Sequence, residues 1–88
     1  MYVQFRAEGK KFHFKQELNP VTNKMEYHIW VRHLVEPEAV LKAFFNIDKK
    51  RFNETHNRFE AYSTMYNLMI YYMEFDVNEF LIITAFYL

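Results

Sequence analysis

The sequence predicts an α+β protein: a three-stranded antiparallel meander followed by two or three helices packed on one face of the sheet. Polar and apolar residues alternate with a period of two through the first third of the chain, as in half-buried strands. A proline between two acids then marks a helix start. Beyond it, apolar residues recur at helical spacing. With 88 residues, we expect one domain over residues 1–88.

The alternation defines three strand-like runs near the N-terminus. Val3 and Phe5 lie on one side of the first run, and Phe12 and Phe14 do so in the second. Gly9 separates these runs and can supply the positive φ of a tight turn. In the third run, apolar residues alternate with polar residues and one indole, so that Met25, Tyr27, Ile29 and Val31 oppose Glu26, His28, Trp30 and Arg32.

The remainder of the chain is predicted to be helical. A first helix begins at Glu36-Pro37-Glu38, and Asp48 can cap a second, longer one. The stripe of this second helix is Phe52, Phe59, Tyr62, Tyr66, Met69 and Met73. Asp76 and Glu79 resemble a capping box, which favours a third helix over residues 77–88. The β-propensity of Ile82, Ile83 and Thr84 keeps a fourth strand as the alternative there.

Composition narrows the possible functions. The chain has no cysteine, which excludes disulfides, thiolate metal sites and thiol catalysis. The uncharged run over residues 80–88 is far shorter than the ~20 residues that span a bilayer, so we expect a cytoplasmic protein without a membrane segment. Aromatic residues make up 20% of the chain, more apolar material than so short a chain can bury. This surplus predicts a partner surface or a homodimer seam.

Charge is distributed unevenly along the neutral chain. Residues 1–33 contain six basic and three acidic side chains, whereas residues 34–88 contain five and eight. The sequence therefore predicts a basic and an acidic pole. Near the C-terminus, Glu74, Asp76 and Glu79 would give the aromatic surface an acidic rim suited to a basic partner.

Two candidate binding surfaces follow from these patterns. For a protein partner, the predicted contact residues are Trp30, Arg32 and Lys15 on the sheet, with Tyr66, Tyr72 and Asp76 towards the acidic end. Single-stranded RNA is the alternative partner, because cations and aromatic rings on an open sheet can bind phosphates and bases. Glu8, Glu17 and Glu26 could instead pair with these cations and leave an ordinary solvated face. The predicted RNA-binding residues are Arg6, Lys11, His13, Lys15, His28, Trp30 and Arg32.

Signals for catalysis or cofactor binding are weak. The four histidines, at positions 13, 28, 33 and 56, show no metal-ligand spacing. Ser63 is the only serine and is predicted to lie within a helix, while Glu54 and Glu60 are predicted to be solvated. We therefore expect a protein without catalytic residues, metal or cofactor.

In size and composition the chain resembles the short early proteins of tailed phages. Like them, it lacks cysteine and catalytic motifs and is rich in Phe, Tyr, Asn and Met. The resemblance covers no motif and identifies no functional residue. It implies a binding protein that inhibits a host enzyme, toxin or defence complex in the host cytoplasm.

Overall fold

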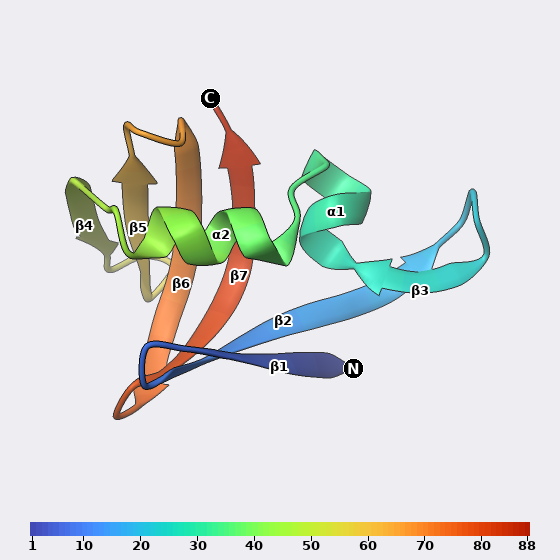
Figure 1. Ribbon diagram of the computed structural model, residues 1–88, viewed down its shortest axis with the longest axis horizontal. Helices are drawn as coiled ribbons and strands as arrows, with labels where there is room; N and C mark the ends of the chain where they lie inside the picture. Colours follow the sequence, from blue (N-terminus) through green and yellow to red (C-terminus); the bar gives the residue numbers. More distant parts are fainter.

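The computed structural model describes residues 1–88, which form one seven-stranded mixed sheet and two short helices (Figure 1). Neither helix combines the length and the apolar character needed to cross a bilayer. The strands are β1 (Tyr2–Ala7), β2 (Lys10–Asn19), β3 (Lys24–Tyr27), β4 (Lys49–Asn53), β5 (Arg58–Ser63), β6 (Leu68–Asp76) and β7 (Glu79–Tyr87), and the helices are α1 (His28–His33) and α2 (Pro37–Phe44).

The strand order β1-β2-β7-β6-β5-β4 shows that the predicted architecture is wrong. A three-stranded meander with two or three helices was expected, but the second half of the chain adds four further strands. Strand β7 joins the two halves, since it pairs antiparallel with β6 and parallel with β2. The only parallel pairing therefore links the N-terminal hairpin to the C-terminal meander.

The first hairpin forms as predicted. Strands β1 and β2 pair antiparallel from Tyr2 opposite Lys15 to Ala7 opposite Lys10. The two residues between them, Glu8 and Gly9, both have positive φ, at 50° and 76°. Positive φ at both central residues matches the twist of a two-residue hairpin, which explains the single glycine.

The third predicted strand is correct only as far as Tyr27. Residues His28–His33 form helix α1 instead, and Leu34 ends it in the left-handed conformation with φ 55°. The parallel pairing of β2 with β7 stops at Phe14 and Ile82. Helix α1 packs against β2, β3 and β7 and contributes Ile29 to the core. This contact overrides the strand-like alternation of the sequence.

Helix α2 begins where the sequence predicts. Glu36 is its extended N-cap residue, Pro37 occupies the first turn, and Val40 and Ala43 are fully buried. In Figure 1 the helix crosses one face of the sheet over β5, β6 and β7.

The long helix predicted after Asp48 does not form, because two asparagine turns divide that segment into β4, β5 and β6. Asn57 and Asn67 each adopt a φ of 52°, a conformation that asparagine tolerates better than most residues. In β6, Leu68, Ile70 and Tyr72 are buried while Met69 and Tyr71 are half-buried, which is the alternation of a strand.

The tail is also a strand, so the helix predicted for residues 77–88 is wrong and its strand alternative is confirmed. Asp76 pairs across the β6–β7 hairpin with Glu79 rather than capping a helix. Asn78 provides the positive φ of this turn, at 55°. Here the β-propensity of Ile82 and its neighbours prevailed over the local capping signal.

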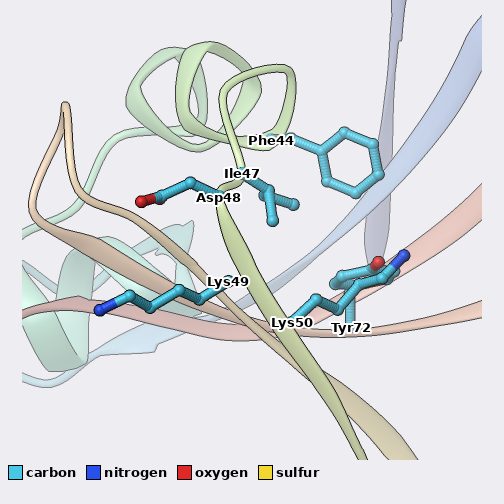
Figure 2. Close-up of a pocket in the computed structure, with 6 residues that line it drawn as sticks. All are labelled: Phe44, Ile47, Asp48, Lys49, Lys50 and Tyr72. Atoms are coloured by element: carbon cyan, nitrogen blue, oxygen red, sulfur yellow. The ribbon is translucent and has the colours of Figure 1, made fainter.

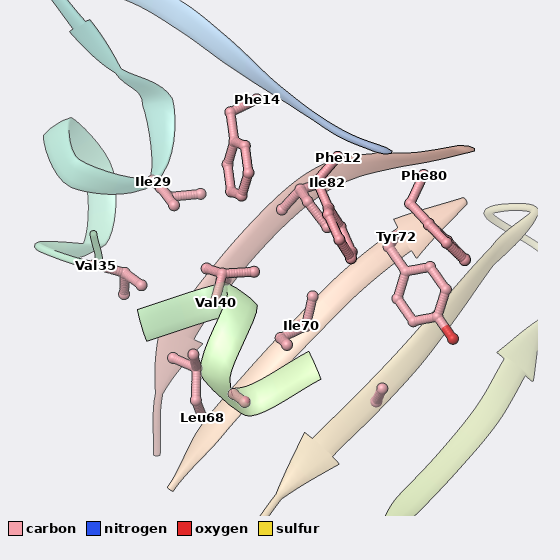
Figure 3. Close-up of a cluster of buried hydrophobic side chains, with 13 residues drawn as sticks. Phe12, Phe14, Ile29, Val35, Val40, Leu68, Ile70, Tyr72, Phe80 and Ile82 are labelled. Carbon is pink, nitrogen blue, oxygen red and sulfur yellow. The ribbon is translucent and has the colours of Figure 1, made fainter. Parts of the chain in front are cut away.

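The core lies between the sheet and the helices. Phe12 and Phe14 from β2, with Ile82 from β7, meet Val40 from α2 and Ile29 from α1 (Figure 3). Rings contribute much of this core: Phe12 stacks on Phe80 at 5.4 Å between centroids, and Phe44 of α2 packs edge-on against both. One face of the sheet is therefore filled by its own chain.

Candidate binding surface

The opposite face of the sheet is not covered by α2. Its side chains come from alternate positions along β1, β2, β4, β5, β6 and β7. Across neighbouring strands, Met69 lies between Tyr62 and Phe86, and Glu60 lies between Arg51 and Tyr71. We call this surface the open face. Its charged and apolar members are Tyr2, Arg6, Lys11, His13, Lys15, Glu17, Lys49, Arg51, Arg58, Glu60, Tyr62, Met69, Tyr71, Met73, Phe75, Asp76, Glu79, Leu81 and Phe86.

The centre of the open face is apolar, and its flanks are basic. Met69, Tyr71, Met73, Leu81 and Phe86 occupy the two central strands and are all half-buried. Cations lie on both sides of this centre: Lys49, Arg51 and Arg58 on β4 and β5, and Arg6, Lys11 and Lys15 on β1 and β2.

The open face is basic overall. It has six basic and four acidic side chains, a net charge of +2, and the remaining residues have five and seven, a net of −2. Three of the four acids are already paired within the chain: Glu17 with Arg32, Glu60 with Arg51 and Arg58, and Glu79 with Lys11. Glu79 lies 3.8 Å from Lys11 and 3.6 Å from His13, so it does not form the acidic rim that the sequence suggested.

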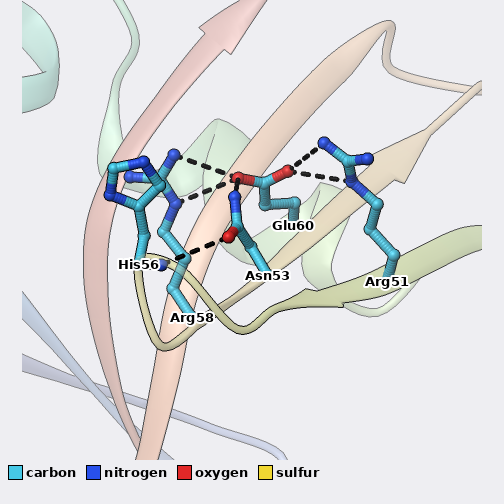
Figure 4. A network of polar contacts seen from close by, with 5 residues as sticks. All are labelled: Arg51, Asn53, His56, Arg58 and Glu60. Atoms are coloured by element: carbon cyan, nitrogen blue, oxygen red, sulfur yellow. Dashed lines mark hydrogen bonds and ion pairs between the residues drawn. The ribbon is translucent and has the colours of Figure 1, made fainter.

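Glu60 organises the β4–β5 end of the open face (Figure 4). Its side chain is 5% exposed. Arg51 donates to Oε1 from Nε at 3.0 Å and from Nη2 at 2.7 Å, while Oε2 accepts from Asn53 and from Arg58, each at 3.0 Å. These hydrogen bonds, with Asn53 contributing most, lower the pKa of Glu60 from 4.5 to about 2. The carboxylate therefore stays ionised and holds two guanidinium groups in place.

A hollow of about 500 Å³ lies beside this network. Tyr62, Met69 and Tyr71 line it, and Lys49, Lys50 and Arg51 contribute its cations. The guanidinium of Arg58 lies 4.1 Å from the centre of the Tyr71 ring, a cation–π contact that fixes both side chains. The Tyr71 ring also meets Phe86 edge to face at 5.3 Å. Rings and cations thus form one ordered surface.

A second hollow, of about 360 Å³, opens at the other end of the open face. Tyr2, His13, Phe75 and Leu81 line it, from β1, β2, β6 and β7. The rings of His13 and Phe75 are 5.3 Å apart. The open face is therefore an undulating apolar surface with a hollow near each end.

The helix-covered side of the sheet also has a hollow, between the end of α2 and β4 (Figure 2). Its carboxylate, Asp48, accepts hydrogen bonds from the Thr64 amide at 2.8 Å and the Thr64 hydroxyl at 2.5 Å, which lower its pKa. Burial, with a smaller contribution from Glu74, raises the pKa of Tyr72. Asp48 thus serves the turn, and these groups do not form an acid–base pair.

The predicted RNA-binding residues divide into two groups. Arg6, Lys11, His13 and Lys15 share the open face, as expected. His28, Trp30 and Arg32 lie on α1 because the third run changes from strand to helix at His28. In addition, Glu17 accepts from Arg32 at 3.1 Å and lies 3.2 Å from His28, contacts that lower the pKa of Glu17.

The predicted protein-contact residues do not share one surface either. Lys15 is on the open face, and Trp30 and Arg32 are on α1. Tyr72 is buried on the helix-covered face, Tyr66 packs against the core from the β5–β6 turn, and Asp76 is exposed at the β6–β7 turn.

Sequence reasoning missed that β4, β5 and β6 form part of the open face. Arg51, Arg58, Tyr71 and Met73 were all placed within one long helix, where they could not form a sheet surface. The signal that could have revealed them is the series Asn57, Asn67 and Asn78, three turn-forming residues about ten positions apart. Comparisons with protein-family models, curated proteins and solved structures found no match, and no group of three or more potential ligands could hold a metal ion.

Proposed function

We propose that this protein acts by binding a protein partner on the open face of its sheet, without catalysing a reaction. The partner surface that fits would be apolar at its centre and acidic at its edge. The resemblance to early phage proteins suggests that the partner is a host enzyme, toxin or defence complex and that binding inhibits it.

The observation that carries this proposal is the arrangement of apolar centre and charged flanks. Protein interfaces concentrate methionine, aromatic residues and arginine at their centre and place lysine at their rim. Met69, Tyr71, Met73 and Phe86 form such a centre, and Lys11, Lys15 and Lys49 lie around it. The net charge of +2 would speed association with an acidic surface and orient it.

Single-stranded RNA is the second candidate partner, and one observation favours it. Arg6 and Lys11 lie directly opposite each other on β1 and β2, and Lys15 is on the same face four residues further along β2. Glu79 offsets the charge of Lys11 but not that of Arg6 or Lys15, and a phosphate backbone would neutralise these two. Base stacking, however, needs open ring faces. Arg58 already covers one face of Tyr71, and Phe86 packs against the same ring, which favours the protein partner.

The test compares two double variants. Each replaces two methionines by alanine, one pair on the open face and the other pair outside it. Met69→Ala with Met73→Ala truncates the centre of the open face, and Met25→Ala with Met65→Ala truncates methionines outside it. Each tagged variant is purified gently from the native cellular setting and analysed by native mass spectrometry, with and without ribonuclease. Circular dichroism verifies that both variants remain folded.

We expect an added protein mass that survives ribonuclease, is lost in the open-face variant and persists in the matched control. Mass that disappears on ribonuclease treatment would replace the protein partner with RNA. A bare homodimer that dissociates in the open-face variant would assign this surface to self-association. An unchanged complex in the open-face variant would contradict the proposed surface.

A further inference from the structure

A separate hollow, outside the open face, combines aromatic rings with carboxylates. It has a volume of about 330 Å³ and lies where β1, β3, α1 and the start of α2 meet. Three rings line it, from Phe5, Tyr27 and Trp30, together with Glu36, Pro37 and Glu38. No residue of this set belongs to the surface described above.

The three rings differ in how many other aromatic rings pack against them. Phe5 and Tyr27 lie 6.0 Å apart at an angle of 57°, and Phe14 fixes both from the core side. Trp30 makes no ring–ring contact, and 36% of it remains exposed. A large indole on a short helix therefore presents its surface to the hollow without an aromatic neighbour stacked on it.

The two carboxylates have no cation of their own. Both glutamates are exposed, and neither forms an ion pair or a side-chain hydrogen bond within the chain. The cation on α1, Arg32, is held by Glu17 at 3.1 Å. Acids in the first turn favour helix formation, which explains their presence on α2. That explanation does not account for three rings gathered beside them.

We propose that this hollow is a cation-binding site that takes the charged end of a lysine or arginine side chain from a protein segment. Aromatic faces attract ammonium and guanidinium groups through the ring quadrupole, and nearby carboxylates supply opposite charge. The stem of a lysine or arginine is apolar and suits a ring-lined wall. This site is independent of the open face, because it uses other residues and the opposite ligand charge.

Trp30 makes the site directly measurable, since it is the only tryptophan of the chain. Its fluorescence is followed while N-acetyl-lysine amide, N-acetyl-arginine amide or N-acetyl-norleucine amide is added at constant ionic strength. The norleucine compound has the same carbon stem as lysine and lacks the ammonium group. We expect a saturable change in Trp30 emission with both cationic compounds and none with the norleucine compound.

Variants separate the contributions of charge and rings. Glu36→Gln with Glu38→Gln should weaken binding of the lysine compound about tenfold, a change of about 1.4 kcal/mol. Phe5→Leu keeps the charge and should weaken binding about threefold, because it removes the cation–π contact of one of the three rings. Glu54→Gln, an exposed acid in the β4–β5 turn, is the control and should leave binding unchanged.

Thermal unfolding followed by circular dichroism shows whether α2 remains folded in the glutamine variant. If it does not, Phe5→Leu carries the test. Equal binding of the norleucine compound, or no saturable change with either cation, would overturn the cation site. Neither result would affect the open face, whose test uses different residues and a different readout.

Discussion

The two faces of the sheet differ in whether the helices of the chain cover them. On the covered face, Phe12, Phe14 and Ile82 are almost fully buried because α1 and α2 pack over them. On the open face, Leu81 is adjacent to Ile82 on β7, Met73 is adjacent to the buried Tyr72 on β6, and both are only half-buried. The covered face therefore stabilises the fold, and the open face keeps apolar area and positive charge for another molecule.

The largest expected difference between the faces is in folding stability. Ile82 and Leu81 can test it, because they are adjacent on β7 and point to opposite faces. Ile82→Ala should lower the free energy of unfolding by about 2–5 kcal/mol, because it leaves a cavity in a closed core. Leu81→Ala should cost about 1 kcal/mol or less, since its site already meets solvent. Denaturant unfolding of both variants measures the contrast. Equal losses would mean that the open face is part of the core.

A smaller effect should appear with acid at the Glu60 network. The folded-state pKa of about 2 lies below the ordinary value of 4.5. The ionised carboxylate thus contributes stability that is fully present above about pH 4.5 and is lost as the pH falls through about 2. Denaturation midpoints measured across this range should decline in the natural chain and decline less in Glu60→Gln. A parallel decline in both would show that Glu60 does not organise the basic end of the open face.

The smallest of these stability effects is expected for substitutions in the turns between the strands. Asn57 has positive φ and no side-chain hydrogen bond. Asn57→Ala should destabilise the protein by about 1 kcal/mol, whereas Asn57→Gly should be close to neutral, because glycine accepts this backbone conformation freely. Thermal unfolding of the pair provides the measurement, and an alanine variant as stable as the glycine variant would contradict this role of the turn.

The sequence predicted an element of the fold correctly where the signal for it came from neighbouring residues. The β1–β2 hairpin and the start of α2 rest on neighbouring residues, such as Gly9 and Pro37, and both were predicted correctly. The segment from Asp48 to Met73 was misassigned because its aromatic residues also match helical spacing. Short apolar runs are ambiguous in this way, and here the turn-forming asparagines outweigh the apparent helical stripe.

The candidate site was predictable only where it rests on the first hairpin. Arg6, Lys11, His13 and Lys15 share a face because of the local alternation in β1 and β2. Glu60 was expected to be solvated, but Arg51 on β4 and Arg58 on β5 enclose it. That network depends on pairing between strands whose existence the sequence did not indicate. The parallel contact of β2 with β7, which joins the two basic flanks across an apolar centre, is similarly non-local.

The methionine methyl groups provide the most direct test of the open face. The chain has five methionines: Met69 and Met73 are half-buried at the centre of the open face, while Met1, Met25 and Met65 are more exposed and lie elsewhere. Methyl-labelled protein is measured by NMR with and without the captured partner. We predict that the signals of Met69 and Met73 shift or broaden while those of Met25 and Met65 stay unchanged. Shifts confined to the exposed methionines, with Met69 and Met73 unaffected, would contradict the account.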